Sequence, residues 1–357
     1  MKIIKILILL LFIPLISCNL KKDSPLPNKN LKSITWKLYT PQNSDLHTHA
    51  IFNILIDRYG NKWITTLDKG LVKFSADGQW QIYTTSNSGL PDNLTRSLAM
   101  DYQDNLWIGT SDGGLVKFDG TNWTVYNPSN SPLLYDHVLS IDVDTKNTVW
   151  FTSCINRSGG LMSYDGIEWN LYTPGNSSLP TNLIEKIFVD PRDNVWLAPA
   201  SGGAVKISEG KWAVYENFYG NGSPTYSLDD FCADNKGNIW ASSSGIDSSL
   251  GIAGTLVRYN GKEWKEFLPS ETGRLGNGVA CIACDHFSNV WASIMLGVGD
   301  VGLTMFNGEE WFIIQDIDPD FPKKTFLWDM AFDENNTLWG TIPDTGFGLI
   351  EIHPEYE

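Results

Sequence analysis

The sequence predicts an all-β fold in which one four-stranded unit is repeated around a ring. Two tryptophan series carry this prediction, and together they hold all but one of the 15 tryptophans of the 357-residue chain. A period of about 44 residues with strand-like segments is typical of β-propellers with one four-stranded blade per repeat. Each member of the first series lies six residues after an aspartate: Trp63, Trp107, Trp150, Trp196, Trp240, Trp291 and Trp339. The second series is Trp36, Trp80, Trp123, Trp169, Trp212, Trp264 and Trp311.

The second unit shows the expected strands most clearly. Asp101 opens the turn between its first two strands, because an aspartate accepts hydrogen bonds from the backbone two residues on. Gly120 lies in the turn between its last two strands, where a hairpin needs a positive φ. We expect strands a, b, c and d of this unit at about 94–100, 106–110, 114–118 and 123–127.

The two ends of the chain predict how the ring closes. Residues 34–40 form a lone d-type strand, and the last unit holds strands a, b and c but no d. Six complete units and these two fragments make seven blades. We therefore expect residues 34–357 to form a seven-bladed β-propeller with four antiparallel strands per blade. The N-terminal strand completes the last blade and removes the free edges of an open array.

Residues 1–17 are predicted to be a lipoprotein signal peptide, with two lysines before a short apolar run. The run is too short to span a bilayer comfortably. The ending Leu-Ile-Ser-Cys resembles the bacterial lipobox, which implies that Cys18 is lipidated. The alternative is an ordinary signal peptide with an incidental cysteine. Residues 18–33 would be the lipidated cysteine and a flexible tether, in the bacterial cell envelope on the periplasmic or outer-membrane surface.

The formal net charge of −15 limits the classes of partner. Such a surface repels phosphate backbones, so nucleic-acid binding is not expected. No second apolar run of spanning length follows the signal peptide, and contact with the membrane is expected through the lipid anchor only. The acidic residues lack the spacing of a calcium-binding loop. We therefore expect no cofactor and no metal.

The second unit also carries a family resemblance. Asp-x-x-Asp-Asn-x-Trp-Ile-Gly-Thr is followed by Gly-Gly-Leu-x-x-Phe-Asp-Gly, and LPDNLTRSL (90–98) leads into strand a. These motifs resemble the two-component regulator propeller repeat, and the resemblance covers nearly all of residues 34–352. It implies a periplasmic sensor propeller of the kind found in membrane-bound histidine kinases, often tied to glycan sensing. Without a kinase after residue 352, the chain resembles the stand-alone sensor in a lipoprotein form.

Loop lengths predict which end of the ring binds. The a–b and c–d turns are short and nearly constant, whereas the d–a and b–c loops vary. In a four-stranded meander these two pairs lie at opposite ends of the blade, which we name the constant face and the variable face. The variable face is the expected binding face. Its longest loops are residues 242–254 and 293–302.

In each unit, the residue that lies eight positions before the turn aspartate is polar. We expect these seven residues to ring the axial mouth on the variable face. His49, Asp136 and Tyr226 interrupt a set rich in asparagine, so we predict that they contact a ligand. The alternative is that side chains at this register cap the incoming loop by bonding backbone groups. We favour the capping role for the asparagines.

Charged side chains four and five residues before the turn aspartate form a second group of candidates. Strand a lines the central channel, where charge is costly unless it is paired or hydrated. One interpretation is a binding funnel with Arg96 on one side and Asp229, Asp230 and Asp329 opposite. The alternative is a water-filled channel with internal ion pairs. Trp328 lies beside this group, and its ring suits either sugar stacking or loop packing.

The cysteines are predicted to be structural and unpaired. Cys281 and Cys284 would lie about 10 Å apart on one strand and on opposite faces of it, which is beyond disulfide reach. With Cys232 they are expected to be small core residues of strand a.

The leading hypothesis is a lipid-anchored extracytoplasmic propeller that binds a glycan or a cell-envelope protein, as an accessory sensor or scaffold. The sequence holds no recognisable nucleophile or paired-acid motif, so we assign no catalytic residue. The alternative is a carbohydrate-active enzyme, a lyase or hydrolase, with acids at the axial mouth. A third hypothesis is a purely structural module of an envelope assembly.

Overall fold

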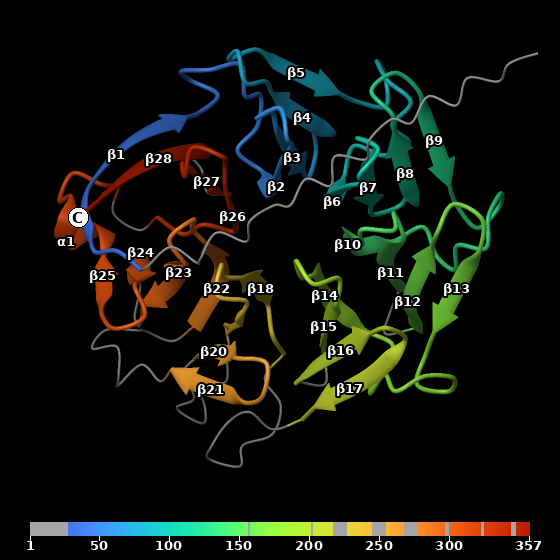
Figure 1. The fold of residues 1–357 in the computed structure, drawn as a ribbon. Coiled ribbons are helices and arrows are strands. Elements are labelled where there is room, and N and C mark those ends of the chain that lie inside the picture. Colours follow the sequence, from blue (N-terminus) through green and yellow to red (C-terminus); the bar gives the residue numbers. More distant parts are fainter. Residues whose placement is uncertain are drawn as a thin grey trace, which may run out of the picture.

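The computed structural model shows a ring of seven four-stranded antiparallel sheets around a central axis, which confirms the predicted propeller (Figure 1). The a strand of each blade lies nearest the axis. The segment before residue 28 and the loop 245–254 lie outside the part of the chain that the structure describes. The described residues are 28–155, 158–200, 203–216, 227–244, 255–267, 278–296, 300–322, 325–343 and 348–357.

Six blades are continuous in sequence, and each contributes one strand to the inner wall. Blades 1 to 3 contain β2 (Ile51–Ile56), β3 (Lys62–Thr66), β4 (Leu71–Phe74), β5 (Trp80–Tyr83), β6 (Thr95–Met100), β7 (Leu106–Thr110), β8 (Leu115–Phe118), β9 (Trp123–Tyr126), β10 (Val138–Val143), β11 (Val149–Ile155), β12 (Ser158–Tyr164) and β13 (Trp169–Tyr172). Blades 4 to 6 contain β14 (Ile184–Val189), β15 (Val195–Pro199), β16 (Ala204–Ser208), β17 (Lys211–Tyr215), β18 (Asp230–Ala233), β19 (Ile239–Ser243), β20 (Thr255–Tyr259), β21 (Trp264–Phe267), β22 (Gly278–Cys284), β23 (Val290–Leu296), β24 (Asp300–Phe306) and β25 (Trp311–Ile313). A short helix, α1 (Ile314–Ile317), follows β25.

The seventh blade joins the two ends of the chain, as the sequence predicts. Its outer strand β1 (Leu31–Tyr39) pairs with β28 (Leu349–Tyr356), and Trp36 lies opposite Ile352. The pairing begins three residues before the predicted strand, because Leu31 is opposite Tyr356. The inner strands of this blade are β26 (Asp329–Phe332) and β27 (Leu338–Thr341).

The aspartate that opens each a–b turn also holds the tryptophan six residues later. In blade 2, Asp101 Oδ1 accepts the backbone N–H groups of Gln103 and Asn105, both at 2.9 Å. Asp101 Oδ2 accepts the indole N–H of Trp107 at 3.0 Å. The indole bond recurs in all seven blades. The fixed spacing follows because a buried carboxylate needs donors for its oxygens.

The third residue after each turn aspartate has a positive φ in every blade. Glycine, asparagine and aspartate tolerate this backbone conformation best, which accounts for the Gly/Asp position of the motif. Asn147 and Asn336 use the position to reach the neighbouring blade, accepting the N–H groups of Tyr102 at 2.8 Å and His286 at 2.9 Å. These bonds link the turns around the constant face.

The hydrophobic core lies between the blades. Trp63 and Leu71 of blade 1 pack in one cluster with Leu106 and Phe118 of blade 2, and comparable clusters fill the other seams. The blade tryptophans therefore pack neighbouring sheets together.

The prediction that Cys232 and Cys284 are separate core residues is wrong. They form a disulfide between β18 of blade 5 and β22 of blade 6, with their Cα atoms 5.8 Å apart. Cys232 lies two positions before the turn aspartate of blade 5, and Cys284 lies one position before that of blade 6. The contact joins two different strands, so spacing within one strand does not reveal it. Cys281 is a free, buried thiol, as expected.

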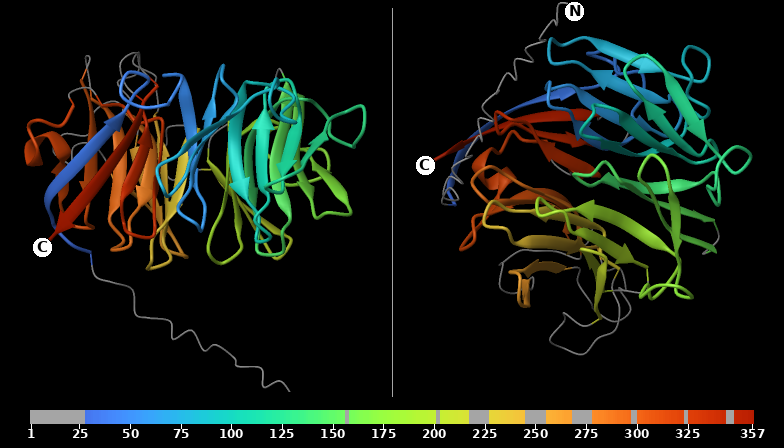
Figure 2. Two further views of the ribbon diagram at one scale, coloured as in Figure 1. Left: turned by 90° about the horizontal axis from the view of Figure 1, so that it is seen from above. Right: turned by 45° about the vertical axis from the view of Figure 1, so that its right-hand side comes forward.

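The d–a and b–c loops share the variable face, which forms one edge of the ring in the side view (Figure 2). The amide of Gly70, in a b–c loop, donates to the carbonyl of Asn93 at 2.8 Å, and Gly114 donates to Asp136 at 2.9 Å. Each bond joins a b–c loop to the d–a loop of the next blade. Among the described residues, no helix is long and apolar enough to cross a membrane.

Candidate ligand-binding cavity on the axis

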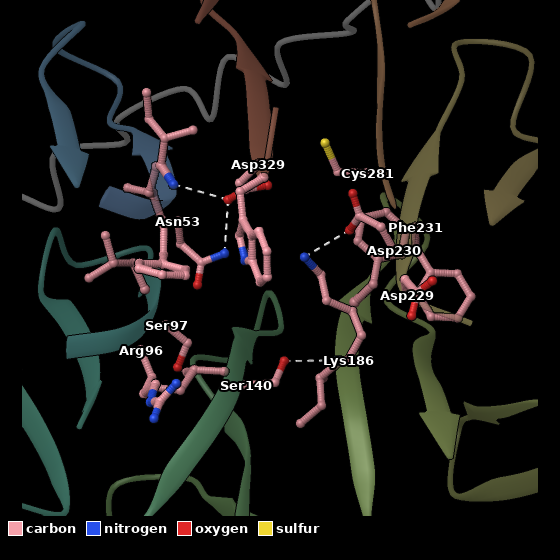
Figure 3. Close-up of a pocket in the computed structure, with 18 of the residues that line it drawn as sticks. Asn53, Arg96, Ser97, Ser140, Lys186, Asp229, Asp230, Phe231, Cys281 and Asp329 are labelled. Carbon is pink, nitrogen blue, oxygen red and sulfur yellow. Dashed lines mark hydrogen bonds and ion pairs between the residues drawn. The ribbon is translucent and has the colours of Figure 1, made fainter. Parts of the chain in front are cut away.

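A cavity of about 1190 Å³ runs along the axis and is lined by the inner strands of all seven blades (Figure 3). Two successive registers of strand a supply most of its polar lining. We name the residues five before the turn aspartate the mouth ring, because they lie nearer the variable face: Phe52, Arg96, Leu139, Glu185, Asp229, Ala280 and Trp328. We name the residues four before it the inner ring: Asn53, Ser97, Ser140, Lys186, Asp230, Cys281 and Asp329.

Three inner-ring side chains accept hydrogen bonds from the backbone of the next blade. Asp230 Oδ2 accepts the N–H of Ile282, and Asp329 Oδ2 accepts the N–H of Ile54, both at 3.0 Å. Ser140 Oγ likewise accepts the N–H of Ile187 at 2.9 Å. Several a strands carry a register shift near this position, which frees an N–H from the ladder of its own sheet. The inner ring satisfies these groups and joins one blade to the next.

Charge within the inner ring is largely compensated. Lys186 Nζ lies 2.8 Å from Asp230 Oδ1, and Asn53 Nδ2 donates to Asp329 at 3.0 Å. Burial lowers the pKa of Lys186, but the carboxylates of Asp230 and Asp329 outweigh this effect and raise the pKa overall. Burial raises the pKa of Asp329, and the charge of Lys186 opposes that rise. The structure thus places Asp230 and Asp329 in internal contacts, as the ion-pair interpretation expects.

One side of the mouth ring is aromatic and cationic. Trp328 is 49% exposed, and its ring meets Phe52 edge-on with centroids 5.2 Å apart. Arg96 follows on blade 2, where its Nε donates to Ser111 Oγ at 2.7 Å. The guanidinium retains further N–H donors for a planar anion.

The other side of the mouth ring is acidic. Glu185 and Asp229 come from blades 4 and 5, and Figure 3 shows Asp229 across the cavity from Arg96. Burial raises the pKa of Asp229, whose Oδ2 accepts the backbone N–H of Ser244. Burial raises the pKa of Glu185, and the neighbouring charge of Asp229 adds to the rise. The cavity is therefore polarised across its width.

The register eight before the turn aspartate does not line this cavity. His49 and Asp136 are absent from its walls, and Tyr226 lies outside the described residues. The carbonyl of Asp136 accepts from Gly114, and the side chain of Asn93 accepts the N–H of Thr85 at 2.9 Å. The Asn93 bond matches the capping alternative, because d–a loops carry backbone groups that need partners.

Asp142 was missed at the sequence level. It lines the cavity two residues before its turn aspartate, and its Oδ2 accepts the N–H of Val189 on blade 4 at 2.6 Å. Burial raises its pKa to about 6. Comparing this register across the units would have found it, because the other members are uncharged: Leu55, Ala99, Phe188, Cys232, Ala283 and Ala331.

The described lining of this cavity contains no histidine and no cluster of metal-ligating side chains. No group of three or more His, Cys, Asp or Glu side chains within the described ranges could hold a metal ion. All five histidines lie in those ranges, and none lines the cavity. Burial and the charge of Arg96 lower the pKa of His137.

Fold and repeat together define a propeller built from one sequence motif. Residues 89–112 match the family model of the two component regulator propeller, and the chain resembles that family, as the motifs of its second unit predict. No curated protein sequence matches the chain.

Solved structures of similar fold come from several bacteria. An extracellular domain described as that of the hybrid two component system BT3049 of B. thetaiotaomicron has 18% identity and a TM-score of 0.69, over 89% of this chain and 41% of that one. Virginiamycin B lyase from Staphylococcus aureus has 14% identity and a TM-score of 0.67, over 89% and 99% of the two chains. PorZ, described as a surface component of the type-IX secretion system of Porphyromonas gingivalis, has 13% identity and a TM-score of 0.57, over 84% and 46%.

These comparisons establish a shared fold. The chain spans less than half the length of the first of these structures, at 41%. Their descriptions differ, as is common among propellers, because function lies in a site carried by the fold.

Proposed function

We propose that the chain is a lipid-anchored extracytoplasmic propeller that binds a glycan containing acidic sugars at its axial mouth. The observation that carries the proposal is the polarised mouth ring, with an exposed Trp328 beside Arg96 on one side and Glu185 and Asp229 on the other. The C–H face of a sugar ring stacks on tryptophan, and a guanidinium binds a carboxylate through two parallel hydrogen bonds.

The acidic side restricts the ligand further. Ionised Glu185 and Asp229 accept hydrogen bonds from sugar hydroxyls and repel a second carboxylate. We therefore expect a glycan in which acidic and neutral sugars occur together. The Cys232–Cys284 disulfide supports an oxidising compartment outside the cytoplasm, where such polymers are encountered.

The binding test uses the mature chain and isothermal titration with oligosaccharides that contain uronic acids, beside neutral oligosaccharides of the same length. Arg96→Gln should weaken binding of the acidic set by roughly 10- to 100-fold, since a charge-assisted hydrogen bond contributes about 1.5–3 kcal/mol. Trp328→Ala should weaken both sets. Arg58→Gln, on the constant face, is the matched control and should change neither.

Equal binding of acidic and neutral sugars by the wild-type chain would contradict the role of Arg96. If no glycan binds, the glycan proposal fails and a cell-envelope protein becomes the better candidate ligand. In that case a partner should raise the melting temperature saturably and lose this effect on Trp328→Ala.

A second candidate function is a carbohydrate-active enzyme. It is favoured by two carboxyl groups on neighbouring blades, Glu185 and Asp229, because burial raises both pKa values, and a raised pKa is the direction that suits a general acid. Asp229→Asn would then abolish turnover of a bound glycan while leaving its binding intact. Binding without any product, measured by chromatography of the incubated oligosaccharide, would exclude this candidate.

A further inference from the structure

The first described residues are fixed to the constant face of the ring. Asn28 Nδ2 donates to the carbonyl of Ser288 at 2.8 Å, in the a–b turn of blade 6. The N–H of Lys29 donates to Asn289 Oδ1 at 3.3 Å. Asn30 accepts from Asn307 Nδ2 at 2.7 Å and from the N–H of Glu357 at 3.1 Å. The chain therefore leaves the propeller at the constant face, on the far side from the variable loops (Figure 2).

Basic and aromatic side chains surround this exit. Lys236 reaches Asn28, and the ammonium of Lys29 lies 4.8 Å from the ring centre of Phe287. The guanidinium of Arg192 lies against Gly237, so close that any Cβ there would collide with it. Arg192, Lys236 and His286 are exposed. We name Lys29, Arg192, Lys236, His286 and Phe287 the exit patch.

The exit patch contrasts with the rest of the molecule. The chain carries a formal charge of −15, yet two adjacent a–b turns present Arg192 and Lys236 here, and the ammonium of Lys29 lies beside Phe287 of the third. The aspartates that open these turns are buried and bound to their tryptophans, so they offer little negative charge at the surface. Lysine and arginine near a bilayer are attracted to anionic headgroups by about 1 kcal/mol each, and aromatic rings favour the same interface.

We propose that the exit patch and the surrounding constant face lie against the membrane, so that the axial mouth opens away from it. The inference rests on the lipid anchor at Cys18 that forms part of the proposed function. Residues 19–27 separate that cysteine from Asn28 and can span at most about 30 Å when extended. The anchor therefore keeps the exit patch within reach of the headgroups, while the variable face is turned to material beyond the membrane surface.

The orientation test uses the full-length lipidated protein in vesicles of phosphatidylethanolamine and phosphatidylglycerol that carry a headgroup quencher. One fluorophore is attached at Asn335→Cys, an exposed turn of the constant face, and in a second sample at Asp45→Cys, an exposed loop of the variable face. We expect loss of fluorescence for the label at position 335 and none for the label at position 45. Equal quenching of the two labels, or stronger quenching at position 45, would overturn the orientation.

A charge variant tests the patch itself. Arg192→Glu with Lys236→Glu should reduce the quenching at position 335, whereas Lys262→Glu, on an outer c–d turn of blade 5, should leave it unchanged. An equal effect of both changes would overturn the role of the exit patch. Mass spectrometry of the N-terminal peptide that contains Cys18 distinguishes failure of the lipid anchor from failure of the orientation. If the chain is not lipidated but still binds glycan, both the anchor and the orientation are refuted. If the chain is lipidated and the two labels are quenched equally, only the orientation is refuted.

Discussion

The inner ring and the mouth ring occupy neighbouring positions of the same seven strands and have different partners. Several inner-ring side chains bond neighbouring blades, as Asp230 does with Ile282 of the next blade and Lys186 of the preceding one. Mouth-ring side chains face the cavity, as the half-exposed Trp328 shows. A charge on strand a that faces a neighbouring blade is therefore used in internal contacts, whereas one that faces the axis is available to the ligand that we propose. Three predictions sharpen this comparison.

The largest effect is expected at a blade-facing pair, the disulfide between blades 5 and 6. Its cysteines are 52 residues apart. Closing a loop of that length stabilises the folded state by about 4 kcal/mol in the chain-entropy account. Cys232→Ser with Cys284→Ser should lower the free energy of unfolding by about that amount, measured by urea denaturation. Adding a reductant should not lower the stability of this variant further. A variant as stable as the wild type would contradict the assignment of the disulfide.

The second effect compares the two rings directly. Asp230→Ala leaves Lys186 without its ion pair and Ile282 without its acceptor, so it should cost about 3 kcal/mol of stability. Glu185→Gln removes a charge from the mouth ring, and we expect a change within about 0.5 kcal/mol. The measurement is urea denaturation at pH 7. Similar losses for the two variants would remove the distinction between the rings.

The smallest effect concerns Asp142 and depends on pH. Its pKa of about 6 in the folded chain exceeds the value of about 4 usual for an unfolded aspartate. The folded state thus binds the proton more tightly, and the free energy of unfolding falls as pH rises from about 4 to about 6. Asp142→Asn keeps an acceptor for Val189 and should gain about 2 kcal/mol over the wild type at pH 7, but nothing at pH 4. Parallel stability profiles would refute this.

The fold could be predicted because its determinants are local. The turn aspartate and the tryptophan six residues later form one hydrogen-bonded unit, so the spacing in the sequence is the contact in the structure. Ring closure followed from the missing d strand of the last unit. The sequence also identified Arg96, Asp229 and Trp328 as candidates, and all three line the axial cavity. They could be found because residue types that are unusual on strand a stand out when seven units are aligned.

The rest depends on contacts between blades, which spacing along one strand does not contain. The pairing of Cys232 with Cys284 and of Lys186 with Asp230 requires the relative rotation of neighbouring sheets. The register of His49 and Asp136, three residues before the mouth ring, does not line the cavity. At that point the chain is still a loop, and its polar groups bond the preceding blade.

Ring closure by β1 has a consequence for the order of events during synthesis and export. Residue 31 pairs with residue 356, so an early strand must wait for the last one. Joining such distant segments is slow, because the entropy of the intervening chain opposes it. Until then β1 and β28 each expose an unpaired strand edge, which is the form most prone to aggregation. A lipid on the short tether before β1 would hold the waiting strand at the membrane where the later blades emerge.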